Sequence, residues 1–207
     1  MIVLLRYNYF TVQRILLLLS LVVLCSCNAT RFVPDGKYLL NRISVNVDTK
    51  NLKRDVLKTH IRQKENLRIL GALKFHLGVY NLSSGTKNDD WLKRIGEAPV
   101  LYDEYLTQRS LDQLQIYLKN KGYYNAVVKD SLIVNEGKKK INLILEIKTN
   151  KPSRIRNTTY FIKDPNLRSI ILKDSVNRLL KPNDIFDLDI LNAERQRITK
   201  YLKDRGY

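Results

Sequence analysis

Few side chains in this chain of 207 residues could carry out chemistry. The two histidines, His60 and His76, are isolated from each other, so the sequence offers neither a metal cluster nor a general-base pair. We expect each to be a partly buried helix residue. Ser83-Ser84-Gly85 lacks the strand–turn–helix context of a nucleophilic serine, and no glycine-rich phosphate loop occurs. The sequence therefore predicts a protein that is not an enzyme and that holds no metal and no cofactor.

Both cysteines, Cys25 and Cys27, follow an uncharged apolar run over residues 15–24, which two arginines precede. This order is typical of a secretory signal peptide, and the run is shorter than the roughly 20 apolar residues of a membrane-spanning helix. The stretch Leu24-Cys25-Ser26-Cys27 resembles the bacterial lipobox, so we expect lipid attachment at Cys27. The alternative is an ordinary signal peptide with an incidental pair of cysteines.

Basic residues are in excess, with 37 Lys and Arg against 20 Asp and Glu and a net charge of +17. Such an excess suggests nucleic-acid binding, but an export signal argues against it. The basic residues are also dispersed in short clusters at Lys53-Arg54, Lys93-Arg94 and Lys138-Lys139-Lys140. We expect solvated surfaces, and anionic lipid head groups are the partner that such charge would fit.

The elements that organise the chain occur twice. A helix-period stripe ends at Gly122-Tyr123, and the same exit recurs 84 residues later (206 − 122) at Gly206-Tyr207. The first exit leads into a predicted strand over residues 126–134 and a return strand over 141–147, in which the odd-numbered residues are apolar. Each repeat is predicted as strand, helix, helix, strand, strand, and the second is cut off before its last two strands.

Local signals place the remaining elements and the domains. Residues 43–47 and 155–162 are predicted as strands, and Asp164-Pro165 as the start of a helix. Apolar residues at helical spacing between Leu70 and Tyr80 belong to a segment that the second repeat lacks. We expect a signal peptide over residues 1–26, a lipid tether over 27–39, a first domain over 40–150 with a helical insertion near 66–97, and the N-terminal part of a second domain over 151–207.

This order of elements, with a helix that ends in Gly-Tyr, resembles the POTRA domain, the periplasmic module of the BamA/TamA family of outer-membrane protein assembly factors. The stretches Gly96–Val100 and Gly122–Ala126 are similar to the lipoprotein-type branch of that family. The resemblance covers about Leu39 to Tyr207 and implies an α+β fold of tandem β-α-α-β-β modules, the second incomplete. The matching residues are Tyr102, Leu106, Leu114, Tyr117-Leu118 and Gly122-Tyr123 in the first copy, and Phe186, Ile190, Ile198, Tyr201-Leu202 and Gly206-Tyr207 in the second.

The function that the resemblance implies is polypeptide binding in the periplasm during assembly and insertion of outer-membrane proteins. An edge strand presents unpaired N–H and C=O groups, so an unfolded barrel precursor can add a strand by β-augmentation. Alternatively, the segment merely completes the domain and is covered by a neighbouring unit. In the family the strand after the Gly-Tyr helix supplies the edge, which corresponds here to Ala126, Val127, Val128, Lys129, Asp130, Ser131, Leu132, Ile133 and Val134.

The resemblance also implies partners and a location. The partners would be unfolded outer-membrane proteins, other assembly subunits and a membrane held through acyl chains such as palmitate on Cys27, but not nucleic acid. Asn28 stands where some lipoproteins carry an inner-membrane retention aspartate, so we expect the periplasmic face of the outer membrane.

Family members continue through further POTRA units into a transmembrane β-barrel, whose alternating segments do not occur in these residues. The sequence would then be a fragment, a truncated reading frame or a form that cannot itself insert barrels, and of these we expect a truncated member. The alternative function is that of an envelope lipoprotein module, which binds another envelope protein or an anionic membrane surface.

Overall fold

The computed structural model of the chain describes residues 11–17, 29–71, 73–83 and 91–207. Cys25, Cys27 and the predicted cleavage site lie outside the described residues. Contacts between Cα atoms divide the chain into two compact units. Unit 1 comprises residues 1–44, 63–104 and 131–144, and unit 2 comprises residues 45–62, 105–130 and 145–207.

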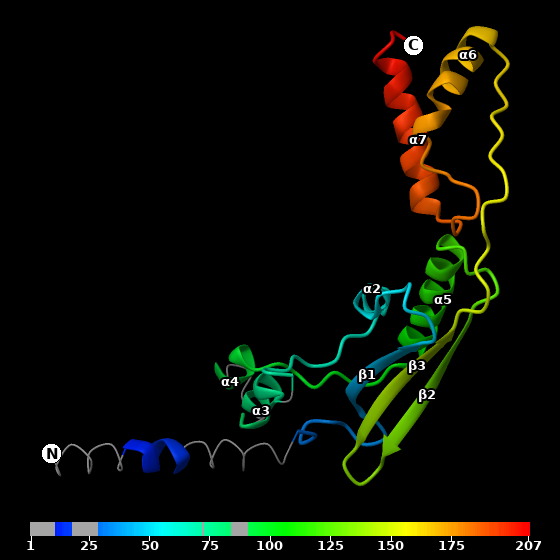
Figure 1. Cartoon of the computed structure of the whole chain (residues 1–207). Helices are drawn as coiled ribbons and strands as arrows, with labels where there is room; N and C mark the ends of the chain where they lie inside the picture. Colours follow the sequence, from blue (N-terminus) through cyan, green and yellow to red (C-terminus); the bar gives the residue numbers. More distant parts are fainter. Residues whose placement is uncertain (1–10, 18–28, 72, 84–90) are drawn as a thin grey trace. The chain divides into compact units, whose positions relative to one another are not determined.

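Three strands form one sheet in the order β1-β3-β2 (Figure 1). They are β1 (Leu39–Val47), β2 (Val127–Asn135) and β3 (Lys140–Lys148). The amide of Leu39 donates to the Lys139 carbonyl at 2.9 Å and that of Asp48 to the Ile147 carbonyl at 3.3 Å, so β1 runs parallel to β3. Residues 136–139 form the turn that joins β2 and β3 as an antiparallel hairpin.

The central strand β3 carries the buried face of the sheet. Its buried residues alternate strictly, as Ile141, Leu143, Leu145 and Ile147. This alternation confirms the parity predicted from sequence. A strand with neighbours on both sides and one covered face needs such a period of two.

Unit 1 contains the two helices of the insertion, α3 (Phe75–Asn81) and α4 (Trp91–Ile95). The helical spacing predicted from Leu70 is wrong at its start, because Ile69 pairs with Leu73 across a turn in which Leu70 has a φ of 52°. The helix therefore begins at Phe75. One apolar cluster of this unit consists of Val33, Leu39 and Leu77, with Ala29 and Leu101 packed against it.

Residues 11–17, also in unit 1, are helical, and the helices that follow here lie in unit 2 apart from the first residue of α5 (Glu104–Asn120). α2 (Arg54–Thr59) and α5 are followed along the chain by α6 (Pro165–Lys173), the 3-10 turn η2 (Asp174–Asn177) and α7 (Leu188–Lys203). As predicted, the Asp164 carboxylate caps α6 by accepting from the Leu167 amide at 2.9 Å, and Pro165 follows it. Asp187 caps α7 in the same manner, through the Asp189 amide.

The predicted strand over residues 155–162 does not form. Its segment pairs only at its start, through a bridge between Arg154 and Ile185 and main-chain bonds of Ile155 to Asp184 and Asn183. A β-strand exists only with a neighbouring strand that satisfies its main-chain groups. Among the described residues no strand lies beside residues 156–162, so β-propensity alone was not sufficient there.

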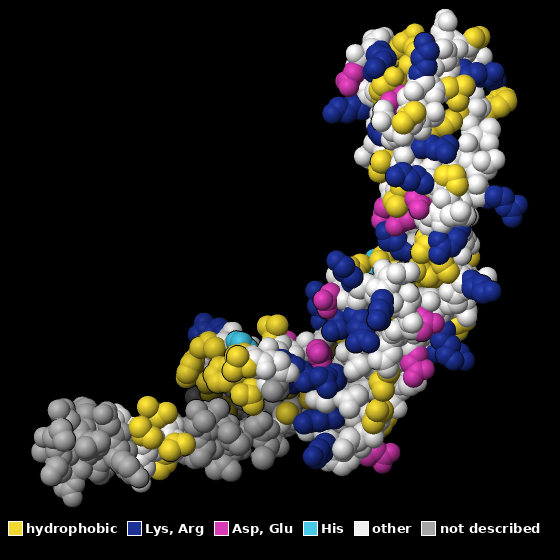
Figure 2. Space-filling model, viewed as in Figure 1, with side chains coloured by type: hydrophobic (Ala, Val, Ile, Leu, Met, Phe, Trp, Pro, Cys, Tyr) yellow, Lys and Arg dark blue, Asp and Glu magenta, His cyan; other side chains and the backbone are white. Residues whose placement is uncertain are grey.

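The basic side chains are dispersed, as their spacing in the sequence predicts. Figure 2 shows Lys and Arg scattered over the visible face rather than gathered into one continuous area. Carboxylates lie among several of them. For example, the Lys139 ammonium is 2.6 Å from an Asp35 carboxylate oxygen.

Candidate functional site

The candidate edge is strand β2, which lies at one side of the three-stranded sheet. The four-residue turn places Asn135 opposite Lys140, and therefore Val134 opposite Ile141 and Leu132 opposite Leu143. Ala126, which was predicted to begin the strand, precedes it. It is buried, and its carbonyl accepts from the Gln115 side chain at 2.9 Å.

The side chains of β2 are open to solvent on both faces of the strand. Every residue from Lys129 to Asn135 is exposed, and only Val128 is half-buried. Leu132, Ile133 and Val134 are therefore exposed apolar side chains in a row. A long exposed apolar strand at a sheet edge is a ready template for pairing with another chain.

The outward main-chain groups of β2 are also uncovered. Within the described part of the chain, no hydrogen bond from outside the sheet reaches the main chain of residues 127–134. In an edge strand, alternate residues direct both N–H and C=O away from the neighbouring strand. This edge can therefore accept a further strand without breaking an existing contact.

The opposite edge of the sheet is covered at its start. The Leu40 amide donates to the Val100 carbonyl at 2.8 Å, and Leu39 pairs with Leu101. Two side chains of the insertion reach the Asn41 carbonyl, Arg68 at 2.6 Å and Lys74 at 2.8 Å. The insertion thus occupies the beginning of β1, an arrangement that sequence reasoning did not predict because no local pattern encodes it.

Burial of Lys74 affects its protonation. Desolvation lowers the pKa of its ammonium to about 8, and the positive charge of Arg68 acts in the same direction. The ammonium is charged at neutral pH and donates to the carbonyls of strand β1. As the pH rises through about 8 the charge is lost, so this part of the cover weakens in alkali.

The entrance to β2 is held firmly. The α5 helix ends at Gly122, which has a φ of 84°, and the Tyr123 amide donates back to the Leu118 carbonyl at 2.8 Å. The Asn150 side chain donates to the Asn125 carbonyl at 2.7 Å. These bonds tie the start of β2 to α5 and to the residues after β3, so the edge belongs to a fixed element rather than to a loop.

The two histidines have structural surroundings. The ring of His60, at the end of α2, lies against that of Tyr117 with centroids 4.3 Å apart, and burial lowers the pKa of its imidazole. His76 lies in α3. In the residues that the structure describes, no group of three or more His, Cys, Asp or Glu side chains is placed to hold a metal ion.

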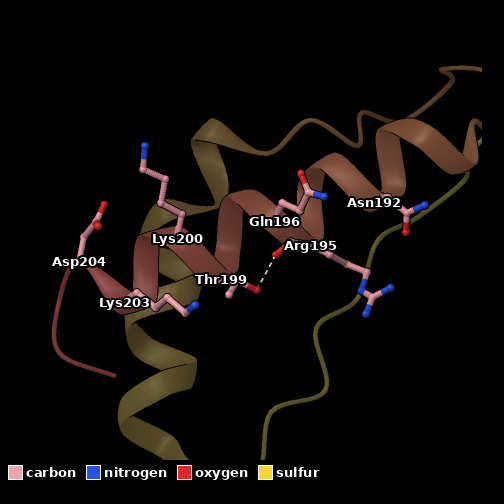
Figure 3. Close-up of a pocket in the computed structure, with 7 residues that line it drawn as sticks. All are labelled: Asn192, Arg195, Gln196, Thr199, Lys200, Lys203 and Asp204. Carbon is pink, nitrogen blue, oxygen red and sulfur yellow. Dashed lines mark hydrogen bonds between the residues drawn. The ribbon is translucent and has the colours of Figure 1, made fainter.

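A groove of about 620 Å³ runs along α7 (Figure 3). Its labelled side chains all come from this helix and its C-terminal end, and they spread along it instead of converging on one point. The Thr199 hydroxyl is engaged by its own helix, donating to the Arg195 carbonyl at 2.9 Å. The lining residues are Asn192, Arg195, Gln196, Thr199, Lys200, Lys203 and Asp204. This groove has no arrangement suited to catalysis.

A family model described as "POTRA: Surface antigen variable number repeat" matches residues 38–150, more than half of the chain. The chain belongs to the POTRA family. Among solved structures it is similar to the crystal structure of Haemophilus influenzae BamA POTRA3-5, with 11% sequence identity over 85% of this chain and 89% of that one. The TM-score of that superposition is 0.29, so it adds nothing to the argument. No curated protein matches the chain.

Membership of the POTRA family confirms the predicted α+β fold. POTRA domains are periplasmic polypeptide-binding modules of outer-membrane assembly factors, and they act as binding scaffolds. No helix among the described residues has the length and apolarity needed to cross a membrane. The lipid at Cys27 and the role of the β2 edge stay predictions at this point.

Proposed function

We propose that β2 binds extended segments of unfolded outer-membrane proteins by strand addition, as the periplasmic part of a lipoprotein-type BamA/TamA assembly factor. The observation that carries the proposal is the open edge of β2, with its exposed apolar row Leu132, Ile133 and Val134. The covered start of β1 supports it, because strand addition is then directed to one side of the sheet.

The energetics favour weak and reversible binding. A nine-residue edge can form about eight main-chain hydrogen bonds with an added strand, each worth about 1 kcal/mol net. Ordering nine residues of an unfolded client, at about 1–2 kcal/mol each, costs about 9–18 kcal/mol and exceeds that gain. Contacts with the apolar row must supply the remainder. The preferred clients therefore have alternating apolar residues, as the strands of outer-membrane barrels do.

Site-specific crosslinking tests the proposal. A photoreactive residue at Lys129 or Ser131 should crosslink to an unfolded barrel-strand peptide. The same residue at Arg195, on the exposed face of α7, serves as the control and should not. Equal crosslinking at both helix and strand would overturn strand addition. Proline removes a main-chain donor, so a proline at the outward-facing position of the edge should lower the crosslinking yield. Ile133→Pro tests the case in which the Ile133 amide faces outward, and Leu132→Pro tests the case in which the Leu132 amide does.

Salt separates this function from its alternative. Raising ionic strength from about 0.1 M to about 1 M shortens the Debye length from about 10 Å to about 3 Å, so charge-driven binding fades. Client binding through main-chain hydrogen bonds should persist over the same range of ionic strength. Client binding that disappears at high salt would instead favour a lipoprotein module that recognises an anionic surface or an acidic partner.

We also propose that Cys27 carries the lipid, on the strength of the Leu24-Cys25-Ser26-Cys27 pattern. Two or more acyl chains hold a protein stably at a bilayer, whereas one binds only marginally. In cells fed a labelled fatty acid, Cys27→Ala should lose the label, and the matched variant Cys25→Ala should keep it. Unchanged labelling of the Cys27 variant would refute the anchor.

A further inference from the structure

The insertion in unit 1 exposes an unusual number of large apolar side chains. Figure 2 shows hydrophobic side chains gathered at the place that α3 and α4 occupy in Figure 1. A soluble protein seldom leaves a contiguous apolar area of this kind without a partner. The side chains, which we call the apolar patch, are Leu67, Ile69, Leu70, Leu73, Phe75, Leu82, Trp91 and Ile95.

The turn around Leu70, which we call the tip of the patch, has a residue type that its backbone conformation does not favour. Leu70 is 93% exposed and has a φ of 52°, followed by Gly71 with a φ of 72°, where Ile69 pairs with Leu73. A left-handed backbone favours Gly or Asn, and a turn in water favours a polar side chain. A leucine here satisfies neither preference. Strain of this kind is typically retained where the residue has a function outside the fold.

The base of the insertion is fixed, so the patch is presented on a stable support. The buried Asn66 side chain donates to the Ala98 carbonyl at 2.7 Å and accepts from the Val100 amide at 3.0 Å. The Glu97 carboxylate accepts from the Leu67 amide at 2.8 Å. These bonds clamp both ends of the insertion together, and the exposure of the patch is therefore a property of the folded unit.

The N-terminal tether packs on the same insertion. The Arg31 guanidinium donates to the Asn81 carbonyl at 2.9 Å, and the ring of Phe32 meets that of Tyr80 edge-on with centroids 5.6 Å apart. Ala29 packs against the cluster that contains Leu77. Two residues span at most about 7 Å, so a lipid on Cys27 would lie close to Ala29 and to this insertion.

The chemistry of the insertion fits a bilayer surface. Tryptophan and other aromatic rings favour the layer between head groups and acyl chains, and Trp91 and Phe75 are both exposed here. The positive charge favours anionic lipids, because the insertion has a net charge of +2 within a chain of +17. Its basic residues are Arg68, Lys74, Lys87, Lys93 and Arg94, and its acidic residues are Asp89, Asp90 and Glu97.

We propose that the apolar patch of the insertion seats in the interfacial layer of an anionic lipid bilayer, beside the N-terminal anchor. The placement beside the anchor rests on the lipid proposed at Cys27. The membrane contact of the exposed apolar side chains does not depend on that lipid. This membrane contact is separate from strand addition at β2. It would hold unit 1 against the membrane through a second, non-covalent attachment.

Trp91 is the only tryptophan of the chain and therefore reports directly on this contact. The acylated protein, purified from the cell envelope, is placed in vesicles of phosphatidylethanolamine and phosphatidylglycerol. We expect a blue shift of the Trp91 emission and quenching by lipids brominated near the head-group end of the acyl chain. Emission that stays unshifted and unquenched while the protein remains attached to vesicles would overturn the proposal.

The variant Leu70→Asn separates a membrane role from a structural one. Asparagine tolerates the left-handed backbone, so folding should be preserved, whereas the tip loses its apolar side chain. Affinity for the vesicles should fall at least about tenfold in the unacylated chain, the factor that corresponds to burial of one leucine. Val176→Asn is the matched control, because Val176 is 89% exposed outside the patch, and its affinity should not change.

An unacylated chain, exported with an ordinary signal peptide and carrying Cys27→Ala, distinguishes the two proposals. Vesicle binding with Trp91 quenching in that chain supports the patch whether or not the lipid exists. Failure of lipid labelling at Cys27 removes the anchor alone. If the unacylated chain ignores vesicles but forms dimers that Leu70→Asn dissociates, the patch is a contact between copies and the membrane proposal is wrong.

Discussion

The helices α5 and α7 end in the same way but bury different faces. Both terminate in a Gly-Tyr pair, with φ of 84° at Gly122 and 83° at Gly206. The tyrosine amides donate back to equivalent carbonyls, Tyr123 to Leu118 at 2.8 Å and Tyr207 to Leu202 at 3.2 Å. Yet Tyr123 is 3% exposed and Tyr207 is 58% exposed. The repeated signal therefore specifies how a helix ends, and does not specify what packs around that end.

The two helices also differ in the residues that they bury. α5 buries the apolar residues Leu114 and Leu118 along with Thr107 and Ser110, all uncharged. The buried residue of α7 is Glu194. An apolar face gains free energy from leaving water, whereas a buried carboxylate costs free energy unless it is paired and hydrogen-bonded.

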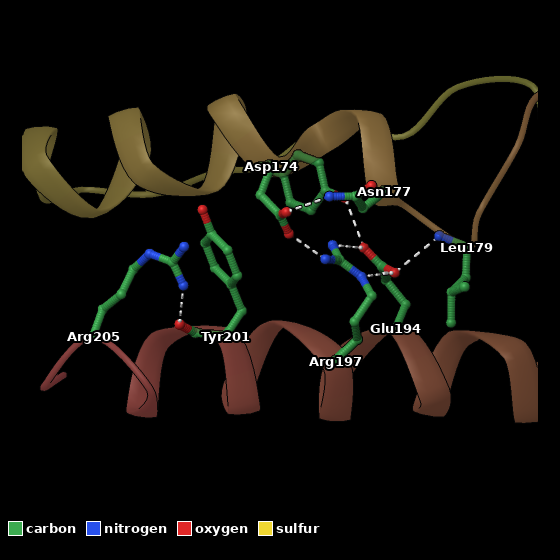
Figure 4. A network of polar contacts seen from close by, with 8 residues as sticks. Asp174, Asn177, Leu179, Glu194, Arg197, Tyr201 and Arg205 are labelled. Carbon is green, nitrogen blue, oxygen red and sulfur yellow. Dashed lines mark hydrogen bonds and ion pairs between the residues drawn. The ribbon is translucent and has the colours of Figure 1, made fainter.

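The partners of Glu194 form a network (Figure 4). The Arg197 guanidinium is 2.9 Å from the Glu194 carboxylate and also binds Asp174 of η2. The Leu179 amide and the Tyr160 hydroxyl donate to Glu194 at 3.0 and 3.1 Å. α7 thus fully buries a charged residue within a polar network, whereas the residues that α5 fully buries are uncharged.

The largest expected difference between the two helix ends is in the stability cost of truncating their tyrosines. Tyr123→Ala should cost about 3–5 kcal/mol of unfolding free energy, the range for a buried aromatic residue. Tyr207→Ala should change it by less than about 0.5 kcal/mol because its side chain is exposed. Amide exchange of β3 in each variant measures the cost. Equal losses of stability in the two variants would contradict the view that only Tyr123 packs into a core.

The variant Tyr123→Phe sharpens the same test. The Tyr123 hydroxyl is buried without a hydrogen-bond partner in the described structure. Removing an unsatisfied buried hydroxyl is neutral or slightly stabilising, so this variant should protect β3 at least as well as the wild type. A marked loss would reveal a partner of the hydroxyl and would weaken the view of Tyr123 as an apolar contact.

A smaller difference is expected between the two glycines. Alanine in a left-handed backbone costs about 1–2 kcal/mol, which should be the whole effect of Gly206→Ala, since nothing lies within 4 Å of the added methyl group. At Gly122 the methyl group would also overlap the Phe186 carbonyl oxygen. Gly122→Ala should therefore cost about 3 kcal/mol, including loss of the nearby 2.8 Å bond from the Ser153 amide to the Gly122 carbonyl. Thermal unfolding of both variants measures the two costs.

Local features of the fold could be predicted from the sequence. The helix ends at Gly122 and Gly206, the cap at Asp164 and the alternation of β3 depend on a few neighbouring residues, and each is confirmed. Features that depend on distant partners could not. The strand predicted over residues 155–162 lacks a neighbour, and the burial of Glu194 depends on Asp174 and Arg197, which no spacing rule connects to it.

The same distinction applies to the candidate site. The edge strand was predicted within one residue at each end, because the Gly-Tyr exit and the Asn135-Glu136-Gly137 turn bracket it. Its exposure on both faces, and the cover of β1 by Arg68 and Lys74, depend on how distant parts of the chain pack. Neither could be derived from the sequence, and client binding at this edge stays a prediction.

Acid should affect α7 more than α5. The Arg197 hydrogen bonds lower the pKa of Glu194 below its ordinary 4.5 and that of Asp174 below its ordinary 3.8. The stabilisation is complete above those ordinary values and is lost as the pH falls through the lowered ones. Amide exchange in α7 should therefore accelerate in acid more than that in α5, whose buried residues are uncharged.

The variant Glu194→Gln isolates this contribution. It keeps an oxygen for the Leu179 amide but loses the charge that pairs with Arg197. The unfolding free energy should therefore fall by about 2 kcal/mol at neutral pH. The acid dependence of α7 should shrink, while that of α5 should not change. An unaltered acid dependence of α7 would mean that other carboxylates control it.

The smallest expected difference between the two helices concerns the basic residue before each glycine. The Lys121 ammonium is 2.9 Å from Asp187 and 2.7 Å from Asp189, at the start of α7, whereas Arg205 lies over the Tyr201 ring at 3.6 Å. Although burial lowers the pKa of Lys121, the bonds to Asp189 and Asp187 raise it overall. Lys121→Met should cost about 1 kcal/mol, and the cost should shrink as salt screens the pair.

Arg205→Met is the matched variant for that measurement. A cation over an aromatic ring at an exposed site contributes about 0.5–1 kcal/mol, close to the value expected for Lys121. The two variants differ in where α7 loses protection from amide exchange. Lys121→Met should speed amide exchange at the first turn of α7, where Asp187 caps the helix, and Arg205→Met should speed it only at the last turn. Exchange that accelerates at the last turn in both variants would show that Lys121 does not hold the start of α7.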